Sequence, residues 1–241
     1  MMRTVLISGA NQGIGFETAR QLARSGCFVY LGSRTKSNGE QAVSKLKESG
    51  ISNIAWMELD VTDVHSVKRA RQELESQTGV LDVLINNAGI AGEQPQNMSA
   101  GDMGNLRNVF ETNFFGVVRT TQQFIPLLKR SSRPVIINVS SEMGSLATQS
   151  HTKNPNRGSY DAYSCSKAAL NAFTVMLSNE LMSAGFRINS VTPGYTATNL
   201  NQYQGAKTPE EGASAIVKYV TMPESEMASG KFFNGDGEIP W

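Results

Sequence analysis

Near its start the chain reads Thr4-Val5-Leu6-Ile7-Ser8-Gly9-Ala10-Asn11-Gln12-Gly13-Ile14-Gly15, a short β-forming run followed at once by three glycines. The run predicts a strand over Thr4 to Ser8, and the amphipathic stretch from Gly13 to Gly26 predicts a helix. Glycines at such a junction allow a tight turn and bring backbone N–H groups close to a pyrophosphate at the helix N-terminus, where the macrodipole favours negative charge. We therefore expect a dinucleotide to contact Gly9, Asn11, Gln12, Gly13, Ile14 and Gly15.

The same alternation of strand and helix runs through the rest of the chain. Further strands are predicted at Phe28 to Gly32, Ile54 to Glu58, Val83 to Asn86, Val135 to Val139, Ile188 to Thr192 and Lys231 to Phe233. Further helices are predicted from Ser37 and Asn38 to Gly50, from a cap at Thr62 or Asp63 to Gly79, and after the capping box Thr208-Pro209-Glu210-Glu211. The nearly continuous apolar strands are typical of parallel strands covered on both faces. This predicts an α/β fold, a doubly wound parallel sheet with helices on both faces, in a single domain over residues 1–241.

Composition and charge narrow the class of partner. The 241 residues are 39% apolar and 18% charged, with 22 Lys and Arg against 21 Asp and Glu and a net charge of +1. This neutrality favours neither nucleic acid nor an anionic membrane as partner. No apolar run approaches the roughly 18 residues of a membrane span, and the apolar start is too short for a secretory signal, so we expect a cytoplasmic protein.

The cysteines and histidines are few and scattered. Cys27 and Cys165 form no CxxC pair, which favours reduced thiols over a disulfide framework. His65 and His151 lie far apart, with no carboxylate or cysteine at metal-ligand spacing. We therefore expect no metal site.

The end of the second predicted strand bears on the choice of nucleotide. It reads Tyr30-Leu31-Gly32-Ser33-Arg34-Thr35-Lys36, with no acid before Glu40. In dinucleotide folds an acid here binds the ribose 2′-hydroxyl of NAD, whereas an arginine accommodates the 2′-phosphate of NADP. Ser33 stands where the acid is expected, and the Arg34 guanidinium can form two hydrogen bonds to a phosphate. We predict NADP (NADPH), with NAD the less favoured cofactor; the alternative is that Arg34 and Lys36 merely belong to a solvated loop.

Two later strand ends add candidate cofactor contacts. Asp60-Val61 can hold the adenine, Asp60 by accepting from its amine, although Asp60 could equally cap the next helix in competition with Asp63. Asn86-Asn87-Ala88-Gly89 supplies small residues that let the chain pass close to the cofactor, with Asn87, Ala88 and Gly89 as contacts. Asn86 or Asn87 can tie adjacent strands through side-chain hydrogen bonds, a purely structural role.

Tyr163 and Lys167 stand four residues apart on a predicted helix and so share one face. An ammonium beside a phenol favours the phenolate, so we expect the Tyr163 pKa to lie below its usual value of about 10. Tyr163 could then exchange a proton with an alcohol or carbonyl oxygen, as general acid in reduction or general base in oxidation.

Two polar residues elsewhere complete a candidate catalytic set. Ser141 ends the strand of Val135 to Val139 and could donate a hydrogen bond to a carbonyl oxygen that gains negative charge; Ser140 is the alternative. Asn113 lies in an otherwise apolar helix, where an unpaired buried amide would cost about 1–3 kcal/mol. A water linking Asn113 to Lys167 would satisfy it and relay protons, whereas capping or bending the helix is the simpler role.

Taken in order, these residues resemble the short-chain dehydrogenase/reductase family. The matching segments are Thr4 to Gly15 with G-x-x-x-G-x-G spacing, Asp60-Val61, Asn86-Asn87-Ala88-Gly89, Asn113, Ser141, Tyr163-x-x-x-Lys167 and Pro193-Gly194. The resemblance implies a Rossmann-like sheet of about seven strands in the order 3-2-1-4-5-6-7, an Asn113-Ser141-Tyr163-Lys167 tetrad and a nicotinamide cofactor that also contacts Tyr163 and Lys167. Ser8 replaces the usual threonine but keeps the hydroxyl.

The segment Thr192-Pro193-Gly194-Tyr195-Thr196-Ala197-Thr198 is similar to the part of the family that lines the nicotinamide. By this resemblance Pro193, Gly194, Thr196 and Thr198 contact the cofactor, and the short stretch to Lys207 is a substrate lid. Substrate would meet Ser141, Met143, Leu146 and Tyr195, a mostly apolar wall that favours a hydrophobic molecule. The polar loops Gly92 to Gly104 and Gln149 to Ser159 follow strand ends on the ligand side and could also contact substrate.

Together these features most resemble the carbonyl-reductase branch of the family. The leading hypothesis is an NADPH-dependent carbonyl reductase that transfers hydride to a ketone or aldehyde with Tyr163 as proton donor. The alternatives are an NAD-dependent alcohol dehydrogenase and a cofactor-sensing protein without chemistry. The helical stretches Leu106 to Arg130 and Ser164 to Ala184 are apolar on more than one face, which fits a homodimer or tetramer or burial within one subunit.

Overall fold

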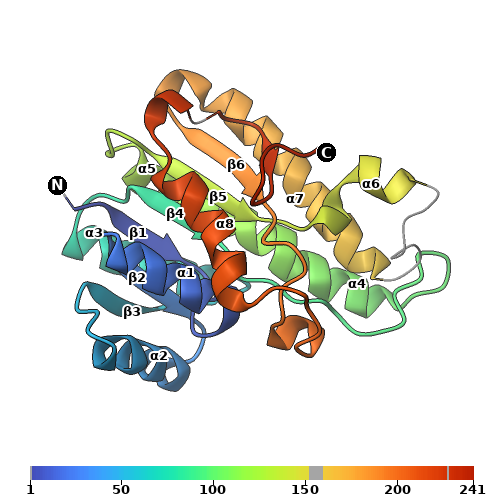
Figure 1. Ribbon diagram of the computed structural model, residues 1–241, viewed down its shortest axis with the longest axis horizontal. Helices are drawn as coiled ribbons and strands as arrows, with labels where there is room; N and C mark the ends of the chain where they lie inside the picture. Colours follow the sequence, from blue (N-terminus) through green and yellow to red (C-terminus); the bar gives the residue numbers. More distant parts are fainter. Residues whose placement is uncertain (1, 152–159, 227) are drawn as a thin grey trace.

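Seven parallel strands form one sheet in the order β3-β2-β1-β4-β5-β6-β7 (Figure 1). The computed structural model describes residues 2–151, 160–226 and 228–241. The strands are β1 Thr4–Ile7, β2 Phe28–Ser33, β3 Ile54–Glu58, β4 Val83–Asn86, β5 Val135–Val139, β6 Arg187–Val191 and β7 Phe232–Phe233. Each lies within one residue of its predicted bounds, and the predicted fold class and strand order are confirmed.

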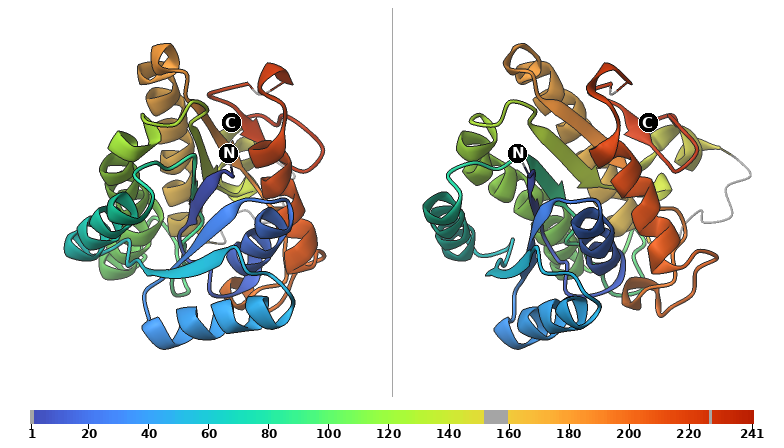
Figure 2. Two further views of the ribbon diagram at one scale, coloured as in Figure 1. Left: turned by 90° about the vertical axis from the view of Figure 1, so that its left-hand side faces the viewer. Right: turned by 60° about the vertical axis from the view of Figure 1, so that its left-hand side comes forward.

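Helices cover both faces of this sheet (Figure 2). They are α1 Gly13–Arg24, α2 Lys36–Glu48, α3 Val64–Gln77, α4 Met103–Phe110, α5 Gly116–Leu128, α6 Leu146–Ser150, α7 Asp161–Glu180 and α8 Pro209–Thr221. Helices α1, α2 and α8 pack with Val5 and Ile7 on one face, while α3, α5 and α7 pack with Leu6 on the other. Successive strand residues point to opposite faces, so a strand that is apolar throughout contributes to both cores.

Several helix boundaries differ from those predicted. The expected helix from Leu106 to Arg130 is broken into α4 and α5 by a π-helical turn, η1, over Glu111–Phe115. Helix α2 begins at Lys36, before Ser37, and α7 begins at Asp161, two residues before Tyr163. Asp63 caps α3 by accepting from the His65 N–H at 2.9 Å, which decides against Thr62.

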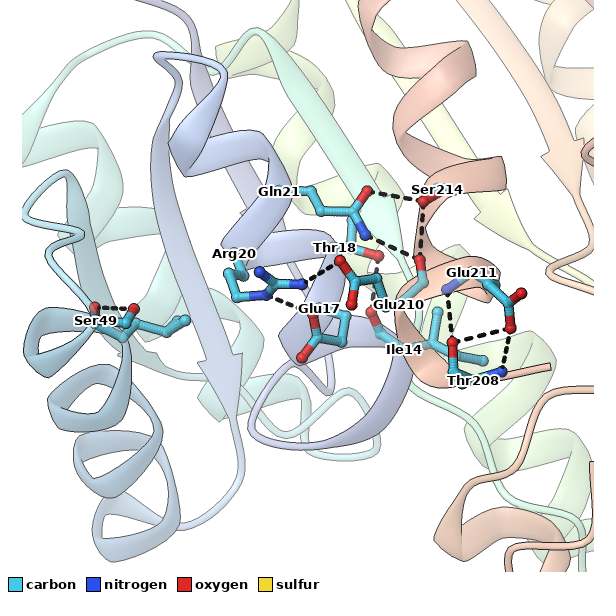
Figure 3. A network of polar contacts seen from close by, with 11 residues as sticks. Ile14, Glu17, Thr18, Arg20, Gln21, Ser49, Thr208, Glu210, Glu211 and Ser214 are labelled. Carbon is cyan, nitrogen blue, oxygen red and sulfur yellow. Dashed lines mark hydrogen bonds and ion pairs between the residues drawn. The ribbon is translucent and has the colours of Figure 1, made fainter.

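Helices α1 and α8 are held together by polar contacts (Figure 3). Arg20 pairs with the Glu210 carboxylate at 2.9 Å, and Gln21 donates to the Glu210 carbonyl at 2.9 Å. The predicted capping box is present, since Thr208 accepts from the Glu211 N–H while Glu211 accepts from the Thr208 N–H. These contacts fix the start of α8 against α1, the helix that follows the glycine loop. They therefore also fix the end of the segment between β6 and α8.

Candidate active site

A cleft of about 770 Å³ opens at the carboxyl edge of the sheet. Its lining brings together most of the predicted site residues: Gly9, Asn11 to Gly15, Arg34, Asp60, Val61, Asn87 to Gly89, Ser141, Met143, Tyr163, Lys167, Pro193 to Thr196 and Thr198. Ser33, Asn113 and Leu146 lie outside this lining. Segments far apart in the chain thus meet because the carboxyl ends of parallel strands share one edge.

The turn after β1 is packed directly against the turn after β4. Gly9 has φ +63°, and a Cβ there would lie 2.8 Å from the Ala88 Cα. The Ser8 hydroxyl, in the position usually held by threonine, accepts from the N–H groups of Asn87 and Ala88 at 3.0 and 3.1 Å. A larger residue at position 9 would therefore push the two turns apart.

The N-terminus of α1 is suited to an anion. Its N-cap residue, Gln12, makes no side-chain cap hydrogen bond, and the first turn of the helix carries no acid. The first N–H groups of a helix lack intrahelical partners and attract negative charge when no side chain caps them. Together with the close approach at Gly9, this forms a backbone cradle that fits a pyrophosphate.

Arg34 and Ser33 have different surroundings. Arg34 is exposed at the rim of the cleft, and within the described part of the chain no hydrogen bond or ion pair engages its guanidinium. Ser33 is only 2% exposed; its hydroxyl accepts from Trp56 Nε1 at 2.9 Å and donates to the Thr35 carbonyl at 3.0 Å. Ser33 is thus buried with its proton already committed, whereas Arg34 is exposed and lines the cleft.

Asp60 and the two asparagines shape the neighbouring turns. Asp60 Oδ1 accepts from the backbone N–H and the hydroxyl of Thr62, at 2.9 and 2.7 Å, so Asp60 orders the turn before α3. Asn86 donates to Asn138 Oδ1 at 2.8 Å across β4 and β5. Asn87 donates to the carbonyls of Ser8 and Gly9 at 3.0 and 2.9 Å. Both asparagines thus tie neighbouring segments, as their structural alternative predicted.

Lys167 is anchored beside Tyr163 in the cleft. Its Nζ donates to the Val139 carbonyl at 2.8 Å and lies 5.6 Å from the Tyr163 ring centroid. Burial lowers the pKa of Lys167 to about 8. Burial also raises the pKa of Tyr163 to about 12, although a hydrogen bond with Ser141 opposes this rise. The expected pKa decrease was therefore wrong in direction: removal of the phenol from water is the largest effect on its pKa, and the Ser141 hydrogen bond only opposes it.

Three side-chain contacts fix helix α7 to the end of β5. Besides the Lys167 contact, Asn138 donates to Thr174 at 2.9 Å, and Ser140 donates to Asn171 at 2.7 Å. Ser140 and Ser141 both line the cleft, but Ser140 is buried and its hydroxyl is committed to Asn171. This commitment of the Ser140 hydroxyl favours Ser141 as the serine that could bind a substrate oxygen.

Asn113 lies in the π-helical turn and is completely buried. Its Oδ1 accepts from the Ile90 N–H at 2.9 Å, and its Nδ2 donates to the Ile90 carbonyl at 2.9 Å and to Ser166 Oγ at 3.1 Å. The side chain is therefore satisfied without the water that was expected to bridge it to Lys167. Asn113 thus connects the segment after β4 with helix α7. This connection lies close to Lys167, since a Cβ on Gly89 would lie 3.3 Å from Asn113 Oδ1 and 3.6 Å from Lys167 Nζ.

This arrangement agrees with the comparison to protein families. The family described as short chain dehydrogenase matches residues 3–209. The chain belongs to the short-chain dehydrogenase family. It is therefore an oxidoreductase of the type that binds a nicotinamide cofactor.

Relatives of this short-chain dehydrogenase match along nearly their whole length. The (+)-neomenthol dehydrogenase of Arabidopsis thaliana is 33% identical over 285 residues, covering 96% of each chain. The structure of salutaridine reductase from Papaver somniferum has a TM-score of 0.85 at 30% identity and covers 96% of this chain and 99% of that one. An NADPH-bound carbonyl reductase from chicken fatty liver has a TM-score of 0.86 at 28% identity, with 100% and 99% coverage.

The substrate side of the dehydrogenase's cleft differs in part from expectation. Met143 and Tyr195 line it, but Leu146 is 68% exposed and does not. Leu200 and Tyr203, in the stretch predicted as a lid, also line the cleft, and Tyr160 is a lining residue that the sequence did not indicate. The positive φ of Tyr160 and Tyr203 has no sequence signal, since tyrosine rarely adopts it. Of the loop Gln149 to Ser159, residues 152–159 lie outside the described residues.

Over residues 2–151, 160–226 and 228–241, no helix has the length and apolarity needed to cross a membrane. In the same ranges, no group of three or more His, Cys, Asp or Glu side chains could hold a metal ion.

Proposed function

We propose that this dehydrogenase reduces ketones or aldehydes with NADPH, with Tyr163 as proton donor. The observation that carries the proposal is one continuous cleft whose lining includes Arg34, the uncapped N-terminus of α1, Tyr163 and Lys167. The cradle fits a dinucleotide phosphate, and Arg34 has a free guanidinium for an additional phosphate. When bound, NADPH supplies a hydride to the substrate carbonyl carbon.

The roles of the protein groups follow from their contacts. Tyr163 donates its phenolic proton to the carbonyl oxygen as that oxygen gains electrons, which leaves a tyrosinate. Ser141 hydrogen-bonds the same oxygen and orients the carbonyl. The Lys167 ammonium, held by the Val139 carbonyl, stabilises the tyrosinate.

The raised pKa of Tyr163 is compatible with a role as proton donor. A phenol with a pKa of about 12 is protonated at neutral pH and is ready to donate. The similarity to a neomenthol dehydrogenase supports one part of the second candidate, the oxidation of an alcohol by the same residues. A cofactor-sensing protein without chemistry is disfavoured, because it would have no need of the buried Lys167 ammonium, which costs desolvation energy.

A panel of ketones, aldehydes and secondary alcohols, assayed with both nicotinamide cofactors, tests this proposal. We expect carbonyl reduction with NADPH to be faster than any alcohol oxidation with NAD at neutral pH, and bulky apolar carbonyls to be the best substrates. A strong preference for NADH, or turnover of alcohols alone, would contradict it.

The reduction rate is expected to fall at alkaline pH. Lys167 carries its charge below a pKa of about 8 and loses it above, while Tyr163, with a pKa of about 12, stays protonated throughout. The kcat/KM for NADPH should therefore be flat near neutrality and decline as pH rises through about 8. In Lys167→Arg, whose guanidinium stays charged, the remaining activity should lack this decline. A rate that increases through the same range would refute the assignment.

A further inference from the structure

Helix α7, which carries Tyr163, is not capped by its own N-cap residue. That residue, Tyr160, has φ 56° and ψ 38° and makes no side-chain cap hydrogen bond. The first residues of the helix are Asp161, Ala162 and Tyr163, whose N–H groups have no carbonyl acceptor within the helix. In most helices the N-cap side chain accepts from the second or third of these N–H groups.

The missing acceptor comes from a residue 67 positions away in the chain. Gln96 Oε1 accepts from the Tyr163 N–H at 3.0 Å, and Gln96 Nε2 donates to the Ala91 carbonyl at 2.7 Å. The residue is 4% exposed, so neither bond is readily replaced by water. Gln96 therefore connects the segment after β4 to the backbone of Tyr163 itself.

We propose that Gln96 is a positioning residue for Tyr163, a role that rests on the proposed function. Two amides hold adjacent residues of one segment: Asn113 binds both backbone groups of Ile90, and Gln96 binds the Ala91 carbonyl. Asn113 also reaches α7 at Ser166, and Gln96 reaches it at Tyr163. The start of α7 is thereby fixed at two points against the segment that carries Gly89, which lies beside Lys167 Nζ.

This placement has a consequence for catalysis and not only for stability. Tyr163 must deliver its proton to a carbonyl oxygen within hydrogen-bond distance, and a displacement of about 1 Å at a reacting group can cost up to 100-fold in rate. Without Gln96 the first turn of α7 would lose its cap and fray. The glycine loop and Arg34 lie elsewhere in the cleft, so cofactor affinity should not depend on Gln96.

The test compares Gln96→Leu, Gln96→Glu and the control Asn105→Leu. Asn105 binds both backbone groups of Glu93, at 2.9 and 2.8 Å, and so supports the same loop, and within the described residues no hydrogen bond joins its side chain to α7. In Gln96→Leu we expect kcat to fall about tenfold with KM for NADPH unchanged, and hydrogen exchange at the start of α7 to accelerate about tenfold. Gln96→Glu keeps the acceptor for the Tyr163 N–H and should recover part of kcat. Asn105→Leu should keep kcat and accelerate exchange only in the loop.

The inference is overturned if Gln96→Leu retains wild-type kcat and exchange, or if Asn105→Leu loses as much kcat as Gln96→Leu. If Gln96→Leu does not fold, Gln96→Glu decides between the two roles. If Gln96→Glu impairs kcat, KM for NADPH and hydrogen-exchange protection equally, Gln96 has a merely structural role. Hydrogen exchange of the unliganded protein separates the two proposals. If the wild-type protein reduced no carbonyl compound, the proposed function would be wrong. Hydrogen exchange would still show whether Gln96 caps α7.

Discussion

Replacement of Tyr163 by phenylalanine is expected to lower kcat for carbonyl reduction by about 10²- to 10⁴-fold, the range for loss of a general acid. The variant removes one oxygen and keeps the ring that lies beside Lys167. In the described part of the chain, Lys167 makes a cation–ring contact with no other tyrosine. The affinity for NADPH should change little, because the glycine loop and Arg34 are untouched. Steady-state rates and a fluorescence titration with NADPH measure the two quantities.

Tyr219→Phe is the matched control for this variant. Its hydroxyl also makes a hydrogen bond, to the Asn234 carbonyl at 2.9 Å, but it does not line the cleft. We expect a small loss of stability and unchanged kcat. If Tyr163→Phe kept a kcat close to the wild-type value, Tyr163 would not be the proton donor.

Arg34→Asp is expected to reverse the preference for the cofactor. A guanidinium can make two charge-assisted hydrogen bonds to a 2′-phosphate, whereas an aspartate repels the phosphate and accepts from a free ribose hydroxyl. The kcat/KM with NADPH should fall about 100-fold, while that with NADH should stay level or rise. The ratio of the two values, measured with one carbonyl substrate, reports the change.

Lys36→Asp controls for the change in charge alone. Lys36 is the exposed first residue of α2, two residues from Arg34; it pairs with Glu40 at 3.8 Å and does not line the cleft. Its effect on the NADPH reaction should be less than about threefold, because exposed charges are screened by salt. Equal losses with NADPH and NADH in Arg34→Asp would mean that Arg34 supports the fold and does not bind the phosphate.

The fold was predictable because its signals are local. Apolar runs such as Val135–Val139, the glycines after β1 and the Thr208 capping box each depend on a few neighbouring residues, and all appear where expected. The strand order followed from family resemblance. The π-helical turn at Glu111–Phe115 was missed because the apolar spacing on either side of it continues like that of a single helix.

Features of the site that depend on distant contacts were not predictable. The sequence cannot show that Trp56 Nε1 donates a hydrogen bond to the Ser33 hydroxyl. Nor can it show that Leu146 is exposed outside the cleft lining. The pKa of Tyr163 was wrong in direction because spacing reveals the nearby Lys167 but not the extent of burial. Gln96 gave no signal either, since its partner Tyr163 lies 67 residues away.

The most direct test of the central claim follows the hydride itself. NADPH that carries deuterium at C4 of the nicotinamide ring is incubated with the wild-type protein and a bulky apolar ketone, and the alcohol is analysed by mass spectrometry. A carbonyl reductase with these roles should place one deuterium on the new carbinol carbon, and Tyr163→Phe should form almost none of this product. If NADPH binds but no deuterated alcohol forms from any ketone or aldehyde of the panel, the protein is not a carbonyl reductase.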